Sequence, residues 1–122
     1  MIGIILAAGK GSRLGSITKD NHKSSLLIKG KPLIEYQLEA FSQAGIHDIF
    51  IITGSNSYLF NSYKRKTTLL HNKNWEHCNM MQSIMRASYL LHKHYAIISY
   101  SDIFYESFAL KAILNQKDLC IL

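Results

Sequence analysis

Cysteine, proline and long apolar runs are all scarce in this sequence of 122 residues. The two cysteines, Cys78 and Cys120, are far apart and form no C-x-x-C pair, which favours reduced packing residues over a disulfide framework or a zinc site. No run of about 18 apolar residues is present, and Met1–Leu6 has neither a cationic prelude nor a cleavage pattern, so neither a membrane span nor a signal peptide is indicated. We therefore expect one cytoplasmic domain, residues 1–122, with no membrane partner.

Acidic residues are also few, and the imbalance is local. The formal net charge is +6, from 14 Lys and Arg against 8 Asp and Glu. Residues 1–31 hold six of the basic residues and a single acid, Asp20, so most of the excess charge lies in this segment. No alternation of aromatic and basic positions, which would favour nucleic acid, accompanies the cluster. The pattern therefore favours a small anionic ligand such as a triphosphate, with no nucleic-acid partner.

The basic segment follows a predicted buried strand. Residues Ile2–Leu6 are apolar on both faces, as expected for a strand inside a parallel sheet. The turn that follows is rich in small residues, which let a ligand approach the backbone N–H groups, and it carries cations. The residues that predict a phosphate-binding loop here are Leu6, Ala7, Ala8, Gly9, Lys10, Gly11, Ser12, Arg13 and, further along, Lys23.

Two common phosphate loops do not match this stretch. The dinucleotide fingerprint needs glycines at relative positions one, three and six, but Gly9 and Gly11 are followed by Leu14, with Gly15 one place late. A Walker loop fails as well, because Gly3 lies one residue too far from Gly9 and because Gly11 stands where the hydroxyl residue is required.

The stretch does resemble the signature of the nucleotidyltransferases that activate sugar phosphates and related small phosphates, L-A-A-G-x-G-x-R-L-x-x-x-T-x-x-x-P-K-x-L. His22 stands where sugar-1-phosphate enzymes usually have Pro, and the H-K-S-x-L version at His22–Leu26 is similar to the phosphocholine cytidylyltransferase branch. The residues that match the signature are Leu6, Ala7, Ala8, Gly9, Gly11, Arg13, Leu14, Thr18 and Lys23.

This resemblance implies a Rossmann-like, three-layer α/β/α fold with a mostly parallel sheet, of the nucleotide-diphospho-sugar transferase type. The hydrophobic pattern agrees, and it places Pro32 in the first turn of the first helix and Gly45 at its end. The predicted strands are 48–53, 67–71, 95–99 and 118–122, and the predicted helices are 33–44, 56–66, 80–91 and 108–114.

The expected extent of the fold follows from the same resemblance. Members of the family run to roughly twice this length, so we expect the chain to hold only the N-terminal, nucleotide-binding half. Its apolar end, 119–122, resembles an unpaired strand, which predicts association with a second copy.

The helix expected at 80–91 has two readings at its start. Asn79 is a candidate N-cap, but by resemblance this segment lies against the nucleotide base, where Asn79 and Ser83 would contact the base edge. The apolar face predicted to enter the core comprises Met81, Ile84, Met85, Ser88 and Leu91.

Asp102 lies just past the end of the strand expected at 95–99, after Tyr100 and Ser101. A carboxylate there lies where doubly wound sheets bind their ligands, although it could instead cap the next helix. By resemblance Asp102 would hold the Mg²⁺ that bridges the nucleotide phosphates, an ion that prefers oxygen ligands.

The resemblance implies transfer of CMP from CTP to phosphocholine or another phosphorylated amine or amino acid, with release of pyrophosphate, for decoration of a surface polysaccharide or lipid. Lys23 would stabilise charge at the α-phosphate and Arg13 charge on the leaving phosphates. Three alternatives stay open: a sugar-1-phosphate nucleotidyltransferase, a nucleotide-binding fragment without catalysis, and a basic module for nucleic acid or a protein partner.

Overall fold

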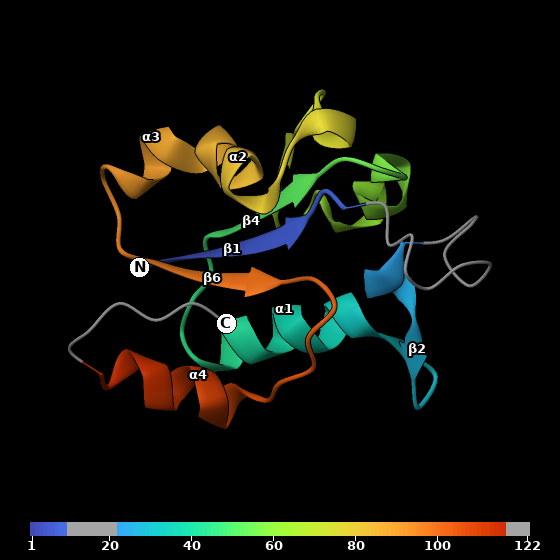
Figure 1. Ribbon diagram of the computed structural model, residues 1–122. Helices are drawn as coiled ribbons and strands as arrows, with labels where there is room; N and C mark the ends of the chain where they lie inside the picture. Colours follow the sequence, from blue (N-terminus) through green and yellow to red (C-terminus); the bar gives the residue numbers. More distant parts are fainter. Residues whose placement is uncertain (10–21, 117–122) are drawn as a thin grey trace.

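A parallel sheet of four strands lies at the centre of the molecule, in the order β5-β4-β1-β6 (Figure 1). The computed structural model describes residues 1–9 and 22–116. All six residues of β1 are buried, and β1 pairs with β4 on one side and with β6 on the other. The strands are β1 (Ile2–Ala7), β4 (Ile49–Thr53), β5 (Thr68–His71) and β6 (Ala96–Tyr100).

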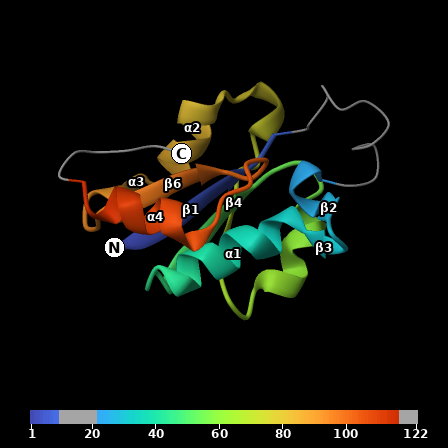
Figure 2. The ribbon, with the colours of Figure 1, turned by 90° about the horizontal axis from the view of Figure 1, so that it is seen from below.

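Helices cover both faces of this sheet, which confirms the predicted three-layer α/β/α arrangement. Two helices, α1 (Leu33–Gln43) and α4 (Ser107–Leu114), pack together on one face, as Figure 2 shows. The opposite face is covered by α2 (Met80–Ile84), the 3₁₀ turn η5 (Met85–Ala87) and α3 (Ser88–Leu91). In the part of the chain that the structure describes, no helix is long and apolar enough to cross a bilayer.

Strand β1 contributes to two separate cores because successive side chains of a strand point to opposite faces. Ile5 and Ala7 pack beneath α1 and α4, together with Phe41. Ile4 and Leu6 pack on the other side. A strand with no charge on either face is thus held by apolar contacts above and below, as the sequence predicts.

The smaller elements lie toward one end of the sheet. A short antiparallel pair, β2 (Leu27–Ile28) and β3 (Lys31–Pro32), leads into α1. Helix α1 begins at residue 33, as predicted, and Pro32 is its N-cap rather than a residue of its first turn. Gly45 follows the C-terminal end of the helix and has φ +82°. The remaining turns are the 3₁₀ helices η2 (Lys23–Ser25), η3 (Ser57–Tyr63) and η4 (Trp75–His77).

Two predicted helices differ in kind from those observed. The segment predicted to be helical at 56–66 forms only the 3₁₀ helix η3, whose N-cap Asn56 has φ 53° and offers no side-chain cap, and in which only Phe60 is buried. The helix predicted at 80–91 is divided by η5. The predicted strand at 118–122 lies outside the described residues.

The predicted core face of the α2 segment was wrong for its methionines. Met81 is 67% exposed and Met85 is 63% exposed, whereas Ile84 and Ala87 are buried with Ser83. The buried stripe includes Ser83, whose hydrogen bond with Asn72 offsets the cost of enclosing its hydroxyl. The apolar pattern alone does not reveal such a partner.

Candidate active site

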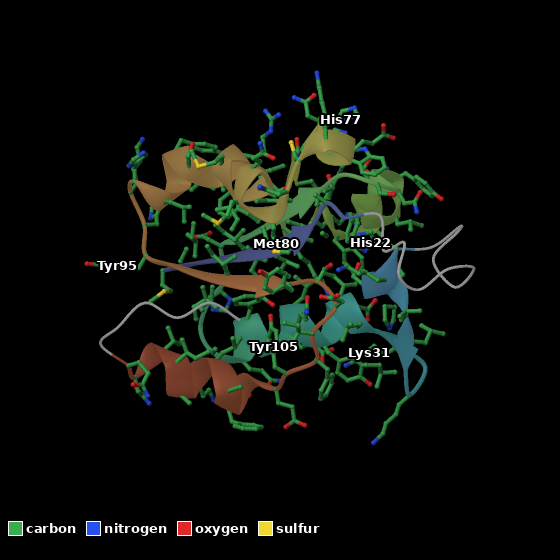
Figure 3. The ribbon with its side chains drawn as sticks, in the orientation of Figure 1. His22, Lys31, His77, Met80, Tyr95 and Tyr105 are labelled. Atoms are coloured by element: carbon green, nitrogen blue, oxygen red, sulfur yellow. The ribbon has the colours of Figure 1, made fainter. Side chains whose placement is uncertain are left out.

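A pocket of about 230 Å³ opens at the carboxyl ends of the central strands. The ends of β1 and β6, the start of α2 and the turn η2 all contribute to it. Figure 3 shows Met80 and His22 toward this end of the sheet, while Tyr95 lies at the other end. The lining residues are Leu6, Ala8, Gly9, Lys23, Trp75, Cys78, Asn79, Met80, Ser83 and Tyr100.

The end of β1 forms the floor of this pocket. Leu6, Ala8 and Gly9 line it, as predicted for the small-residue turn, whereas Ala7 points into the core beneath α1. Among the described atoms, none would lie within 4 Å of a Cβ added at Gly9. Glycine at this position therefore leaves open space beside the backbone rather than relieving a clash.

The next strand end is packed much more closely. A Cβ added at Gly54, which follows β4, would lie 2.5 Å from the Ala8 carbonyl oxygen and 2.6 Å from the Trp75 Cβ. These distances are far below van der Waals contact. Gly54 thus allows Trp75 to approach the end of β1 and to form one wall of the pocket.

Lys23, which lines the pocket, is paired with Asp102, although 79 positions separate them in the sequence. The Lys23 Nζ lies 2.8 Å from the Asp102 Oδ2, and the two side chains are 20% and 45% exposed. A half-exposed pair of this kind contributes little to stability. The arrangement places one cation and one carboxylate side by side, where an anionic ligand and a metal ion can both be held.

The turn that carries Asp102 is fixed by a side chain of α1. Gln37 is fully buried, and its Nε2 donates to the carbonyl oxygens of Tyr100 at 2.8 Å and of Ile103 at 2.5 Å. These two carbonyls flank Asp102 in the chain. Because a polar residue in a predicted helix ordinarily faces solvent, this positioning role of Gln37 is visible only in the tertiary structure.

His22 is a second residue whose role the sequence did not reveal, beyond its departure from the usual Pro. Its Nδ1 accepts from the Ser24 N–H at 3.2 Å and its Nε2 lies 3.1 Å from the Gly9 carbonyl oxygen. Because a backbone N–H only donates, the ring hydrogen is on Nε2, which donates to Gly9. The neutral ring thereby joins the end of β1 to the turn that carries Lys23.

Burial and, to a lesser extent, the neighbouring Lys23 ammonium lower the pKa of His22 from 6.5 to about 4. The ring is 1% exposed and meets Phe60 edge-on, with centroids 5.1 Å apart. A protonated ring would direct a second N–H at the Ser24 N–H. His22 is therefore neutral at pH 7, which keeps this link between Gly9 and Ser24 intact.

The start of α2 combines a cap with a pocket wall. The Asn79 Oδ1 accepts from the Gln82 N–H at 2.9 Å, and the Gln82 Oε1 accepts from the Asn79 N–H at 2.8 Å, so the two residues form a capping box. Asn79 is the N-cap that the sequence predicts, and it also lines the pocket with Ser83. The Asn79 Oδ1, which would hydrogen-bond a nucleotide base, already accepts a hydrogen bond from the Gln82 N–H of the helix.

Several predicted phosphate-binding residues lie outside the described part of the chain. They are Lys10, Gly11, Ser12 and Arg13, and the signature residue Thr18 also lies there. The described residues bring together Leu6, Ala8, Gly9, Lys23, Asn79 and Ser83 around the pocket, with Asp102 paired to Lys23.

The donor set around Asp102 suits Mg²⁺. This ion is held in nucleotide sites by one or two carboxylates, with phosphate oxygens and water completing the octahedron. Asp102 offers a half-exposed carboxylate, and no group of three or more His, Cys, Asp or Glu side chains that could hold a metal occurs within residues 1–9 and 22–116. A single carboxylate beside a lysine ammonium fits the oxygen-ligand preference of magnesium.

Comparison with known proteins agrees with this geometry. The family model described as "Nucleotidyl transferase" matches residues 2–118. The chain belongs to the nucleotidyl transferase family. The predicted family and fold are thus confirmed.

Among curated nucleotidyl transferases, the chain is 34% identical over 126 residues to the CTP:phosphoglutamine cytidylyltransferase of Campylobacter jejuni, with 97% of this chain and 50% of that protein covered. It is 39% identical over 99 residues to the choline-phosphate cytidylyltransferase of Haemophilus influenzae, covering 80% of this chain and 42% of the relative. The chain therefore spans about half the length of the curated relatives it matches.

A solved nucleotidyl transferase structure is similar as well. The CTP:phosphocholine cytidylyltransferase of Streptococcus pneumoniae superposes with a TM-score of 0.77 at 28% identity, covering 88% of this chain and 49% of that one. The described sheet and its covering helices are thus those of the family fold.

Proposed function

We propose that this chain binds CTP and supplies the nucleotide half of a cytidylyltransferase, which transfers CMP to a small phosphorylated acceptor. The observation that carries the proposal is the ion pair between Lys23, which lines the pocket, and Asp102. It combines a motif cation with a carboxylate from a distant strand end. The relatives' names supply the nucleotide and the acceptor class, a phosphorylated amine or amino acid.

The reaction is an attack by an acceptor phosphate oxygen on the α-phosphorus of CTP. A new P–O bond forms, the bond between the α-phosphorus and the bridging oxygen breaks, and pyrophosphate leaves. Both reactants are anions, so the protein must neutralise charge and align the groups rather than provide covalent chemistry. Lys23 would act at the α-phosphate, and Arg13 on the leaving phosphates.

Asp102 would hold Mg²⁺. When bound, this ion would neutralise phosphate charge and orient the leaving pyrophosphate. Asp102 would then exchange its ion pair with Lys23 for the metal, and the Lys23 ammonium would be available to the nucleotide. The 2.8 Å contact thus keeps each of the two charges compensated before the ligand arrives.

The proposal also covers the acceptor substrate, the cellular compartment and the oligomeric state. We infer a phosphorylated amine or amino acid used to decorate a surface polysaccharide or lipid, with the reaction taking place in the cytoplasm. A sugar 1-phosphate is the alternative acceptor. Association with a second copy is a further part of the proposal.

Titration of the whole chain with CTP in the presence of Mg²⁺ tests the nucleotide site. Lys23→Met is expected to weaken CTP binding by about tenfold or more, because a charge-assisted contact to phosphate is lost. Lys93→Met is the matched control, since Lys93 is exposed before β6, at the opposite end of that strand from the pocket, and its loss changes the net charge equally. Equal affinities in the two variants, or no binding of CTP by the unaltered chain, would overturn the proposal.

Catalysis is tested separately by pyrophosphate release. The protein is incubated with CTP, Mg²⁺ and one acceptor at a time: phosphocholine, a phosphorylated amino acid or a sugar 1-phosphate. Release with the phosphorylated amine or amino acid supports the proposed acceptor class, and release with the sugar alone supports the alternative. Tight CTP binding with no release from any acceptor would indicate a nucleotide-binding protein without transferase activity.

A further inference from the structure

Asn72 lies behind the pocket, in the loop after β5, and is fully buried. Its amide makes three hydrogen bonds. The Oδ1 accepts from the Asn74 N–H at 3.1 Å and from the Arg86 Nε at 3.3 Å, and the Nδ2 donates to the Ser83 Oγ at 3.1 Å. Two of these partners, the Asn74 N–H and the Arg86 Nε, determine which way the amide faces.

The orientation of the Asn72 amide follows from its partners. A backbone N–H and a guanidinium N–H can only donate, so the side that faces Asn74 and Arg86 must be the oxygen. The Nδ2 group therefore faces Ser83, and the Ser83 oxygen must accept from it. A reversed amide would direct N–H groups at two donors while fully buried, which is costly.

The hydroxyl of Ser83 is polarised by this contact. Because its oxygen accepts from Asn72, its own hydrogen points away from Asn72. Ser83 is 5% exposed and lines the pocket. Among the contacts described, Asn72 is the one hydrogen-bond partner of the Ser83 hydroxyl, so its hydrogen is available to a ligand.

We propose that Asn72 is a specificity-determining positioning residue, which fixes the Ser83 hydroxyl as a hydrogen-bond donor and makes the pocket select a base edge that offers an acceptor. The inference rests on the proposed nucleotide-binding function. Both bases offer the acceptor O2, and uracil also offers O4, so the discrimination depends on the ring nitrogen N3, which is an acceptor in cytosine and carries a hydrogen in uracil. In this proposal the Ser83 hydroxyl faces N3, where a fixed donor favours CTP over UTP.

Asn72→Asp reverses this polarity with almost no change in shape. A carboxylate only accepts, so the contacts from Asn74 and Arg86 are retained while the Ser83 hydroxyl turns to donate to residue 72. The serine oxygen then presents lone pairs to the pocket. We expect the ratio of the UTP to the CTP dissociation constant to fall by about tenfold, because a polar site discriminates strongly against an unmatched group.

Ser83→Ala provides a second test that does not bury a new charge. Removing the hydroxyl is expected to lower the preference for CTP over UTP, and adding Asn72→Asp to Ser83→Ala should have no further effect on that ratio. Ser99→Ala is the matched control, because Ser99 is equally enclosed within β6 and its hydroxyl donates to the Tyr100 carbonyl rather than facing the pocket.

Calorimetric titration of the whole chain with CTP and with UTP, each with Mg²⁺, measures the two dissociation constants and their ratio. A fall in the ratio for Asn72→Asp and for Ser83→Ala, with Ser99→Ala unchanged, supports the inference. If the unaltered chain binds CTP and Ser83→Ala has the same ratio of the UTP to the CTP dissociation constant as the unaltered chain, this inference alone is overturned. Failure of the unaltered chain to bind either nucleotide overturns the proposed function, and this inference with it.

Discussion

At the scale of the residue, His22 shows how one buried side chain joins two parts of the site. It donates to Gly9 at the end of β1 and accepts from Ser24 beside Lys23. The contact from the Ser24 N–H requires an unprotonated Nδ1 and so the neutral ring, and burial together with the neighbouring Lys23 ammonium lowers the pKa of His22 from 6.5 to about 4. The charge state of His22 is thus coupled to the folded state.

The stability of the protein should depend on this group between pH 7 and pH 4. The unfolded chain binds a proton on His22 near pH 6.5 while the folded chain does so only near pH 4, so the stabilisation is fully present above pH 6.5 and is lost as the pH falls toward 4. A shift of this size corresponds to about 3 kcal/mol. Urea unfolding of the protein at pH 7, 5.5 and 4.5 measures the loss.

His22→Asn removes the titrating group, so the free energy of unfolding should depend less steeply on pH between pH 7 and pH 4. His77→Asn is the control, because His77 is exposed and its replacement should leave the profile unchanged. Profiles of equal steepness for His22→Asn and the unaltered protein would show that other groups cause the pH dependence.

At the scale of the element, the α2–η5–α3 segment separates what periodicity predicts from what packing decides. The sequence correctly predicts a helix start with Asn79 as its N-cap. It does not predict which stripe is buried, because Met81, Ile84 and Met85 share one apolar face in the sequence. In the structure the buried stripe contains Ser83, which is hydrogen-bonded to Asn72, while the methionines are exposed.

Truncation of the two neighbouring residues should therefore have unequal effects. Ile84→Ala removes buried methyl groups from the core that contains Ile4 and Leu6, and we expect it to lower the free energy of unfolding by about 2–4 kcal/mol. Met85→Ala should change it by about 0.5 kcal/mol or less, because the side chain is 63% exposed. Chemical denaturation of both variants measures the difference, and equal losses would contradict the described packing.

At the scale of the whole molecule, the basic charge concentrated in residues 1–31 belongs to a nucleotide site in our proposal rather than to a nucleic-acid surface. A ligand that binds only the folded state raises the unfolding temperature. At a CTP concentration of about 100 times its dissociation constant the gain is about 2.7 kcal/mol, which for a chain of this size corresponds to about 10 °C.

Thermal unfolding with CTP and Mg²⁺ measures this shift. A single-stranded oligonucleotide is the comparison ligand. A larger shift with the oligonucleotide, which disappears as salt is raised, would favour the nucleic-acid alternative over the nucleotide site.

Some features of this protein are decided by sequence alone. The uncharged run in β1, the small-residue turn after it and the spacing to Lys23 predict the parallel sheet, the layers and the family, because these features depend on local period and on neighbouring residues. Only the tertiary structure decided that Lys23 contacts Asp102, that Gln37 and Asn72 are buried, and that Met81 is exposed. Each of these depends on a partner far away in the chain, and a hydrogen-bond partner can reverse the burial that polarity alone predicts.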